Sequence, residues 1–309
     1  MKASGFGLTM EIVSKNLAEL NIEGNRALAL GFFDGIHKAH REVIENAEGE
    51  GLVKTVVTFK EDPSLYLSGT TEYLISDSDK EAKLMNMGVK SLVKLDFNEV
   101  KDLTAEEFFS QVLLNKLKAK LISCGDNYRF GKNASGGVKL LKELCEKNGV
   151  TLSVIKPSLF ENQLISATRI RKLIKNGEIE KANLMLESKL SFENTVIKGN
   201  RIGNKLGFPT ANIALPDGFI VPKFGVYGTV VTFENEKYVG VTNIGVKPTV
   251  GSDKVLAETW IQGFDKDIYG KNIRLELVKF IRPERKFDSL EALKVQVFKY
   301  AEEAKSIKY

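Results

Sequence analysis

Apolar residues in the first half of the chain are grouped into short runs that alternate with amphipathic segments. The runs are rich in β-branched residues and predict buried strands at 26–33, 53–59, 91–97, 119–125 and 151–157. The segments between them predict helices at 38–48, 77–88, 103–118 and 136–149, and Thr104 with Glu107 forms a capping box at the start of the third. Strands separated by helices predict an α/β domain with a parallel sheet.

The pattern changes near residue 188, after two more predicted helices at 167–177 and 178–188. Strand-like runs at 190–198, 225–245, 256–264 and 272–281 are joined by Gly, Asn and Asp turns, and residues 234–237 predict a hairpin loop. A single helix is predicted at 289–306. We therefore expect two domains, a Rossmann-like domain of residues 1–187 and a small antiparallel Greek-key β-barrel of residues 188–309 with a C-terminal helix.

Composition and charge narrow the possible partners. The 309 residues carry 45 basic and 40 acidic side chains, a net charge of +5 without a long block of one sign, which suits small anionic ligands and predicts neither a nucleic-acid nor a membrane partner. The two cysteines are too few for a disulfide scaffold. No signal peptide and no apolar run of membrane-spanning length is present, so we expect a cytoplasmic protein.

Both histidines of the chain lie in one short segment, GFFDGIHKAHR at 31–41. It follows the first predicted strand and precedes a helix, the place where α/β sheets bind ligands. Gly31 and Gly35 allow close approach of the backbone to a phosphate, and His37 and His40 can donate hydrogen bonds to phosphate oxygens beside Asp34. Two alternatives remain: solvated or capping histidines, and a metal site that would need a third ligand.

A second glycine-rich segment, GNRIGNKLGFPTANI, occupies 199–213. Its glycines recur every four residues with basic residues between them, a pattern that can wrap phosphates. These residues are Gly199, Arg201, Gly203, Lys205 and Gly207. In the following FPTAN segment, Thr210 and Asn212 are two residues apart, so in an extended chain they share one face and offer oxygen ligands to Mg²⁺. The alternative is a glycine-rich surface loop that leads into a strand.

The first segment resembles the GxFDGxHxGH signature of the nucleotidyltransferase superfamily, and ISATRIRKLIKNG at 165–177 resembles its companion motif. CGDNYRFGK at 124–132 resembles a flavin- and adenine-binding segment of the prokaryotic FAD synthetases, with Asn127 where an Asp is usual. The chain departs from the signatures at Ala39 and Ala167, which replace a glycine and a serine. The resemblance implies nucleotide or flavin binding by Gly31, Phe33, Asp34, Gly35, Asn127, Arg129, Ser166 and Thr168, and charge stabilisation by His37, His40 and Arg171.

The second segment resembles the riboflavin kinase signature, in which the Thr and Asn of PTAN bind Mg²⁺ and ATP. Stretches at 225–231, 243–251 and 258–293 resemble later motifs of that family. The resemblance implies that Glu258 is the catalytic base, that Thr210 and Asn212 bind the metal, and that Phe208 and Pro209 belong to the nucleotide site. Trp260 stands where the family has a histidine.

Over residues 25–305 the chain thus resembles the bifunctional prokaryotic riboflavin kinase/FAD synthetase family. The resemblance implies that riboflavin and ATP yield FMN in the barrel, and that FMN and ATP yield FAD and pyrophosphate in the first domain, both with Mg²⁺. Two alternatives are a monofunctional kinase with a degenerate first domain, suggested by Ala39, Ala167 and the altered segment 58–67, and a flavin- or nucleotide-binding regulator without turnover.

Overall fold

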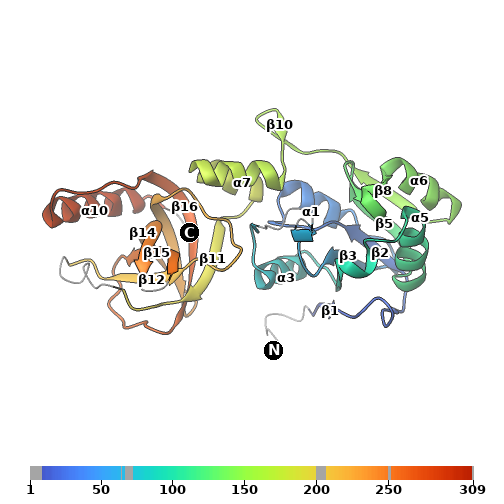
Figure 1. The fold of residues 1–309 in the computed structure, drawn as a ribbon, viewed down its shortest axis with the longest axis horizontal. Helices are drawn as coiled ribbons and strands as arrows, with labels where there is room; N and C mark the ends of the chain where they lie inside the picture. Colours follow the sequence, from blue (N-terminus) through green and yellow to red (C-terminus); the bar gives the residue numbers. More distant parts are fainter. Residues whose placement is uncertain (1–8, 64, 67–71, 200–206, 250–251, 308–309) are drawn as a thin grey trace. The chain divides into compact units, whose positions relative to one another are not determined.

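The computed structural model describes residues 9–63, 65–66, 72–199, 207–249 and 252–307. The chain divides into two compact units, the first of residues 1–71 and 77–166 and the second of residues 72–76 and 167–309 (Figure 1). Among the helices in these ranges, none is long and apolar enough to cross a lipid bilayer.

The first unit alternates strands and helices, as the hydrophobic pattern predicts. Its main strands are β1 (Glu11–Val13), β2 (Arg26–Leu30), β3 (Val53–Phe59), β4 (Ser91–Leu95), β5 (Ala119–Gly125) and β8 (Thr151–Ile155). Its helices are α1 (Lys38–Glu45), α3 (Asp77–Asn86), α4 (Phe97–Val100), α5 (Ala105–Glu107), the π-helix η1 (Phe108–Lys116), the 3₁₀-helix η2 (Lys132–Ala134) and α6 (Val138–Lys147). Four two-residue strands complete it: β6 (Arg129–Phe130), β7 (Gly136–Gly137), β9 (Leu159–Phe160) and β10 (Gln163–Leu164).

The six main strands form one parallel sheet in the order β1-β4-β3-β2-β5-β8. After the edge strand β1, the chain enters the middle of the sheet at β2, builds outward through β3 and β4 toward β1, and then returns to add β5 and β8 on the other side. The strand order therefore reverses between β2 and β5, and in such sheets ligands bind at the carboxyl ends of the strands at this point. The predicted parallel α/β fold is confirmed.

The helix predicted at 103–118 differs in detail from the structure. Thr104 and Glu107 form the expected capping box, with the Thr104 hydroxyl accepting from the Glu107 N–H and the Glu107 carboxylate accepting from the Thr104 N–H. After one α-helical turn the segment continues as the π-helix η1. Its buried Phe108 and Phe109 join the apolar core that also contains Leu28 from the sheet.

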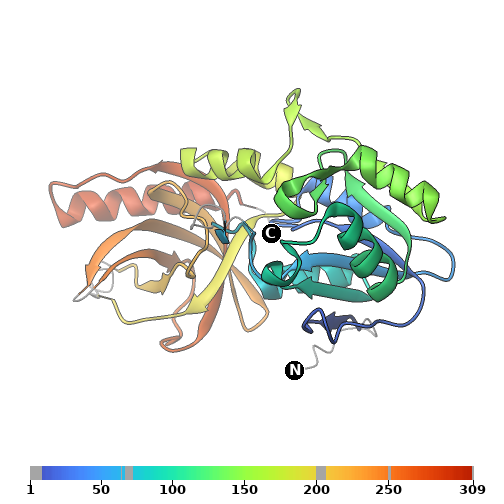
Figure 2. The same ribbon diagram turned by 45° about the vertical axis from the view of Figure 1, so that its right-hand side comes forward.

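The second unit begins with α7 (Ala167–Asn176) and α8 (Ile179–Leu186) and ends with α10 (Leu290–Ala304). Its strands are β11 (Leu190–Thr195), β12 (Thr210–Ala214), β13 (Gly225–Phe233), β14 (Glu236–Thr249), β15 (Ser252–Ile261) and β16 (Asn272–Pro283). They form an antiparallel sheet in the order β11-β16-β13-β14-β15-β12 (Figure 2). Because β16 returns beside β13 after the meander β13-β14-β15, the sheet is a Greek key, as predicted.

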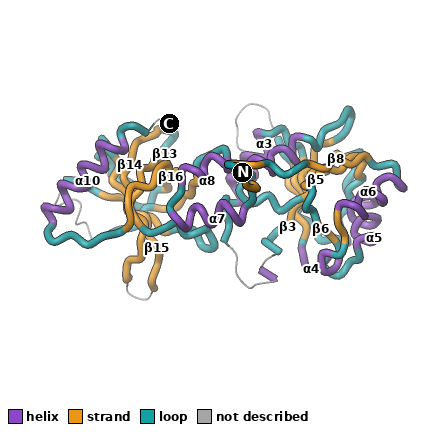
Figure 3. The backbone as a smooth tube through the Cα atoms, turned by 90° about the horizontal axis from the view of Figure 1, so that it is seen from above, coloured by secondary structure: helices purple, strands orange, loops and turns teal. Residues whose placement is uncertain are grey.

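The two edge strands of this sheet approach each other and close the barrel. The Ile197 N–H, just beyond β11, donates to the Asn212 carbonyl of β12 at 2.8 Å, and the Asn194 amide donates to the Ala214 carbonyl at 3.0 Å. Helix α10 lies along strands β13 and β14 (Figure 3), where Tyr300 packs in an apolar cluster with residues of these strands. The predicted barrel with a terminal helix is confirmed.

The limits of the compact units differ from the expected division at residue 187. Helix α8 packs on strands β11 and β16, and its Asn183 side chain donates to the Leu277 carbonyl at 2.8 Å, so α7 and α8 group with the barrel. Residues 72–76 also group with it, because the Tyr73 N–H donates to the Gly218 carbonyl at 2.9 Å. The division into catalytic domains at residue 187 stays a prediction.

Candidate active sites

The histidine turn, residues 31–40, leaves the carboxyl end of β2 at the reversal point of the parallel sheet. The segment 126–131 leaves the carboxyl end of the neighbouring strand β5, which pairs with β2 through Ala29 and Ser123. Both segments therefore lie at the same edge of the sheet. Within the second segment the side chains of Asn127 and Arg129 are exposed, so they are accessible to a ligand at this edge.

The two histidines of the turn are stacked on each other. Their ring centroids are 3.6 Å apart with an angle of 17° between the planes, and the Phe33 ring meets the edge of this stack 5.3 Å from His40. His37 is the N-cap of α1, and its Nδ1 accepts from the His40 N–H at 3.4 Å. Since Nδ1 accepts, a neutral His37 carries its proton on Nε2.

His40 is held in its neutral form. Burial lowers its pKa well below the usual range, and the neighbouring His37 and Lys80 lower it further. Its Nδ1 is buried without a hydrogen-bond partner among the residues that the structure describes. A buried polar atom without a partner is costly, so this nitrogen is a natural contact for a bound group.

The backbone of the turn clarifies the departure at Ala39. Three positions of the turn have positive φ angles, Phe33 at 57°, Gly35 at 80° and Ile36 at 45°. Ala39 is not among them, because it lies in the first turn of helix α1. An alanine is favourable in a helix, so the substitution of the usual glycine does not strain the turn.

Lys80, in helix α3, is a charged residue beside the histidine turn that the sequence analysis missed. It is only 5% exposed, its Nζ lies 4.6 Å from the centroid of the Phe32 ring, and it donates to the Phe32 carbonyl at 3.5 Å. Burial lowers its pKa, whereas the carboxylates of Asp77 and Asp34 raise it. The sequence gives no signal for this position, because a lysine near a helix start is usually solvated.

The companion motif lies at the start of helix α7. Ser166 precedes the helix, Thr168 is exposed in its first turn, and Arg171 follows one turn later. The Arg171 Nε donates to the Glu72 carbonyl at 2.7 Å. Ala167, where the family has a second serine, is the first residue of the helix.

In the barrel, strand pairing brings the expected kinase residues together. Asn212 of β12 lies directly opposite Glu258 of β15, which in turn lies opposite Asn243 of β14. Directly paired residues share one face of a sheet. The Thr210 hydroxyl, on the same face of β12, donates to Glu258 Oε1 at 2.9 Å. The Thr210 hydroxyl thus holds the carboxylate on the face of the sheet that also carries Asn212 and Asn243.

Asn212 provides a test of whether these residues fit a metal ion. Its side chain is 3% exposed, and its Oδ1 is buried without a hydrogen-bond partner in the described part of the chain. A β-carbon on Gly199 would lie 2.5 Å from the Asn212 amide nitrogen, so the glycine is needed for this close approach. An unpartnered amide oxygen beside a hydroxyl fits Mg²⁺, which prefers oxygen ligands. The expected phosphate-binding residues Arg201, Gly203 and Lys205 lie outside the described residues.

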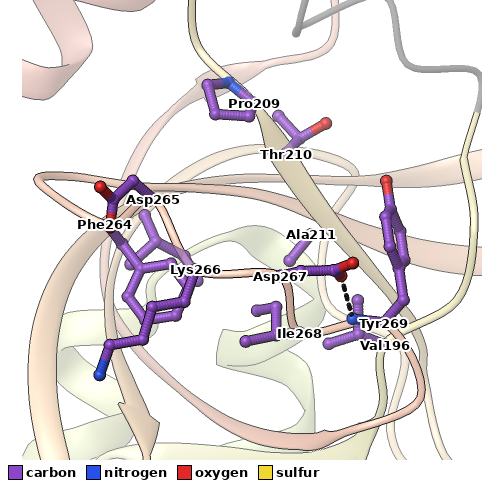
Figure 4. Close-up of a pocket in the computed structure, with 11 residues that line it drawn as sticks. Val196, Pro209, Thr210, Ala211, Phe264, Asp265, Lys266, Asp267, Ile268 and Tyr269 are labelled. Atoms are coloured by element: carbon purple, nitrogen blue, oxygen red, sulfur yellow. Dashed lines mark hydrogen bonds between the residues drawn. The ribbon is translucent and has the colours of Figure 1, made fainter.

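A cavity of about 270 Å³ opens beside Thr210 (Figure 4). Its walls come from the start of β12, with Pro209 and Thr210, and from the loop 264–269. The loop is shaped by Asp267, whose carboxylate accepts from the Tyr269 N–H at 3.1 Å. The motif stretch 258–293 contains this loop, but the sequence analysis singled out none of its side chains. The available signal was the stretch FDKDIY at 264–269, in which two aspartates lie between two aromatic residues.

Trp260 has a packing role in the barrel. It lies opposite Thr210 in the pairing of β12 with β15. Its ring centroid is 6.0 Å from that of Phe208 and 5.2 Å from that of Phe298 in helix α10. The tryptophan at the usual histidine position therefore joins the glycine-rich segment to the C-terminal helix through aromatic contacts.

Comparison with known proteins finds a family match for each part of the chain. Residues 20–169 match the family model of FAD synthetase, and residues 186–308 match that of riboflavin kinase. A bifunctional riboflavin kinase/FMN adenylyltransferase of Buchnera aphidicola from Schizaphis graminum is 34% identical over 92% of this chain and 94% of that protein. The protein of the same name from Listeria monocytogenes is 32% identical over 89% of this chain and 90% of its own length.

A solved structure supports the same fold. The crystal structure of a protein named as a macrolide-efflux protein, from Streptococcus pneumoniae, aligns with a TM-score of 0.88 and 30% identity, covering 97% of this chain and all of that one. Its name describes that protein and adds no argument about this chain. From the two family matches and the relatives that it covers almost end to end, this chain belongs to the family of bifunctional riboflavin kinase/FMN adenylyltransferases.

Proposed function

We propose that the barrel phosphorylates riboflavin. The observation that carries the proposal is the row of Thr210, Glu258 and Asn212, held on one face by strand pairing. Glu258 accepts the proton of the ribityl 5′-hydroxyl as that oxygen attacks the γ-phosphorus of ATP, the bond to the ADP oxygen breaks, and FMN and ADP form. The Thr210 hydroxyl orients the carboxylate for this transfer.

The nucleotide and its metal fit beside this row. The Asn212 Oδ1 and the Thr210 hydroxyl would hold Mg²⁺, which neutralises phosphate charge when bound. We assign the nucleoside of ATP to the cavity between β12 and the loop 264–269, because the cavity shares Thr210 with the row. The positioning of the phosphates is assigned to Gly199, Gly207, Phe208 and Pro209 and to the expected residues within 200–206. These assignments stay predictions.

We propose that the first unit adenylylates FMN at the histidine turn. An oxygen of the FMN phosphate attacks the α-phosphorus of ATP, and pyrophosphate leaves. His37 and His40 donate hydrogen bonds to phosphate oxygens and stabilise the charge that develops there. The helical position of Ala39 supports retained activity over a degenerate domain, because the turn does not need the missing glycine.

The remaining assignments rest on the family resemblance. Gly31, Phe33, Asp34 and Gly35 would shape the nucleotide site, whereas Asn127 and Arg129 would contact flavin or adenine. Ser166, Thr168 and Arg171 are assigned to ATP phosphates by the same resemblance. The substrates riboflavin, FMN and ATP follow from the proposed reactions.

Paired variants test this division of labour. His37→Ala with His40→Ala should abolish FAD formation from supplied FMN and leave FMN formation from riboflavin unchanged, because the two reactions use different residues. Glu258→Ala should abolish FMN formation from riboflavin and leave FAD formation from supplied FMN unchanged. Glu193→Ala, which removes an exposed glutamate from strand β11, is the matched control and should change neither rate. Both products are separated by chromatography over time.

Loss of both reactions in a folded histidine variant would refute the separate sites. FMN formation at the unaltered rate by Glu258→Ala would reject Glu258 as the base.

A further inference from the structure

Lys80 reaches the histidine turn from outside the sequence motif. It belongs to helix α3, and its ammonium group approaches the Phe32 carbonyl at 3.5 Å. The Thr58 hydroxyl of strand β3 donates to the same carbonyl at 3.0 Å. The peptide that enters the strained part of the turn is thus anchored by a strand and by a helix.

Three carboxylates partly offset the burial of Lys80. Burial lowers the pKa of Lys80 and Lys94 of β4 lowers it further, whereas the carboxylates of Asp77 on its own helix, Asp34 in the turn and Asp62 after β3 favour the charged form. The Phe32 ring, 4.6 Å from Nζ, adds a cation–π contact. A buried ammonium with such partners is a fixed charge, unlike a surface lysine.

The histidine pair belongs to the turn that Lys80 contacts. His37 and His40 are stacked 3.6 Å apart, so protonation of both would place two like charges in contact. Burial is the largest cause of the lowered pKa of His40, and the charges of His37 and Lys80 lower it further. A positive charge stabilises a bound phosphate, and the charge of Lys80 does so whether or not the histidines are protonated.

We infer that Lys80 is a positioning residue for adenylyl transfer, which anchors the histidine turn through the Phe32 carbonyl and places a buried positive charge at the turn that carries His37 and His40. The inference rests on the proposed function, because that function makes the turn important. The effect of the Lys80 charge on the histidines, however, can be measured without turnover. It adds a residue of helix α3 to a site that the motif confines to residues 31–40.

The two histidines allow a direct measurement of this effect. Because the chain contains no others, protein with ¹³C-labelled histidine gives only two ring signals, and these are followed against pH by NMR. In the wild type, one signal should stay neutral well below the usual histidine pKa. In Lys80→Met, its midpoint should rise by about half a pH unit or more, because a nearby positive charge is lost.

Lys80→Arg and Lys83→Met are the matched variants. The first keeps the charge at the same place, and the second removes a lysine from the next turn of the same helix. Both should titrate like the wild type. Unchanged midpoints in a folded Lys80→Met protein would overturn the inference. If that variant does not fold, two wild-type histidines that both titrate at the usual value would overturn it equally.

The rate of FAD formation from supplied FMN gives a second readout. In Lys80→Met the acidic limb of its pH profile should move to higher pH together with the NMR midpoint, while FMN formation from riboflavin stays unchanged. A lower rate with an unmoved profile would mean a merely structural role and contradict the inference. A wild type that forms no FAD refutes adenylyl transfer instead, and the NMR result then still decides the role of Lys80.

Discussion

At the scale of single residues, the kinase site depends on close contacts that leave little space for a larger side chain. Gly199 faces the amide of Asn212, and the Asn212 Oδ1 has no hydrogen-bond partner among the described residues. The sequence predicts that Thr210 and Asn212 share a face, because they are two residues apart before an apolar run. It does not predict that Glu258 lies opposite Asn212, since the pairing of β12 with β15 joins positions far apart in the chain.

Gly199→Ala should therefore reduce FMN formation strongly. The added β-carbon would lie 2.5 Å from the Asn212 amide nitrogen, so the amide must move away from its position. A displacement of about 1 Å at a reacting site can cost on the order of 10²-fold in rate. We expect a loss of that size in FMN formation, with FAD formation from supplied FMN unchanged.

Asn212→Ala supplies the control for this change. It removes the amide that the new methyl group meets, so Gly199→Ala should cause little further loss in the Asn212→Ala background. Equal losses in both backgrounds would show that Gly199 acts through something other than Asn212.

At the scale of elements, the sequence predicted the repeating strands and helices well. Strands β3 and β5 have the predicted limits, because each is a short apolar run ended by polar residues or glycine. Strand β1 was missed, because only one of its three residues is buried and it pairs at the edge of the sheet. The π-helix η1 was also missed, since its apolar residues fit an α-helical pattern.

The start of helix α1 shows which site features a pattern cannot reveal. The sequence places His37 and His40 at a helix start, but their stacking and the approach of Lys80 depend on how α3 packs beside the turn. The spacing of residues in α3 predicts a helix but does not predict which side of it packs against the turn. Lys80 is buried there, although the segment is rich in polar residues.

The buried, neutral His40 should make the stability of the first unit depend on pH. Its pKa is lowered in the folded protein, so as the pH falls below about 6.5 the unfolded chain takes up a proton first. The stability that neutral His40 contributes is therefore complete above that pH and is lost progressively toward the lower pKa of the folded state. Denaturant unfolding should give a lower free energy of unfolding at about pH 5.5 than at about pH 7.5.

His40→Asn identifies the source of this dependence. The variant keeps a polar side chain but removes the titration, so its free energy of unfolding should change less between the two pH values. The same dependence in wild type and variant would show that other groups cause it.

At the scale of the whole molecule, the order of the two folds was predictable, whereas the limits of the two compact units were not. The change from helix-separated strands to a run of strands near residue 188 predicts an α/β domain followed by a barrel, and the structure confirms both folds. Residues 72–76 belong to the compact unit of the barrel through the backbone pairing of Tyr73 with residues 218 and 220. Such a long-range pairing leaves no local pattern.

The chain joins a site built on a carboxylate with a site built on two histidines. Glu258 is held by strand pairing in the second unit, whereas His37 and His40 are held by the turn after β2 in the first. FMN is the product of the first proposed reaction and the substrate of the second. The central claim is therefore that one chain carries out both steps in sequence.

The most direct test is a time course with the purified wild-type protein, riboflavin, ATP and Mg²⁺, in which the flavins are separated by chromatography. The account predicts that FMN appears first and FAD follows, and that FMN supplied alone with ATP also yields FAD. FMN that accumulates without FAD, even when FMN is supplied directly, would contradict the account, because the histidine turn would then have its structure without its reaction.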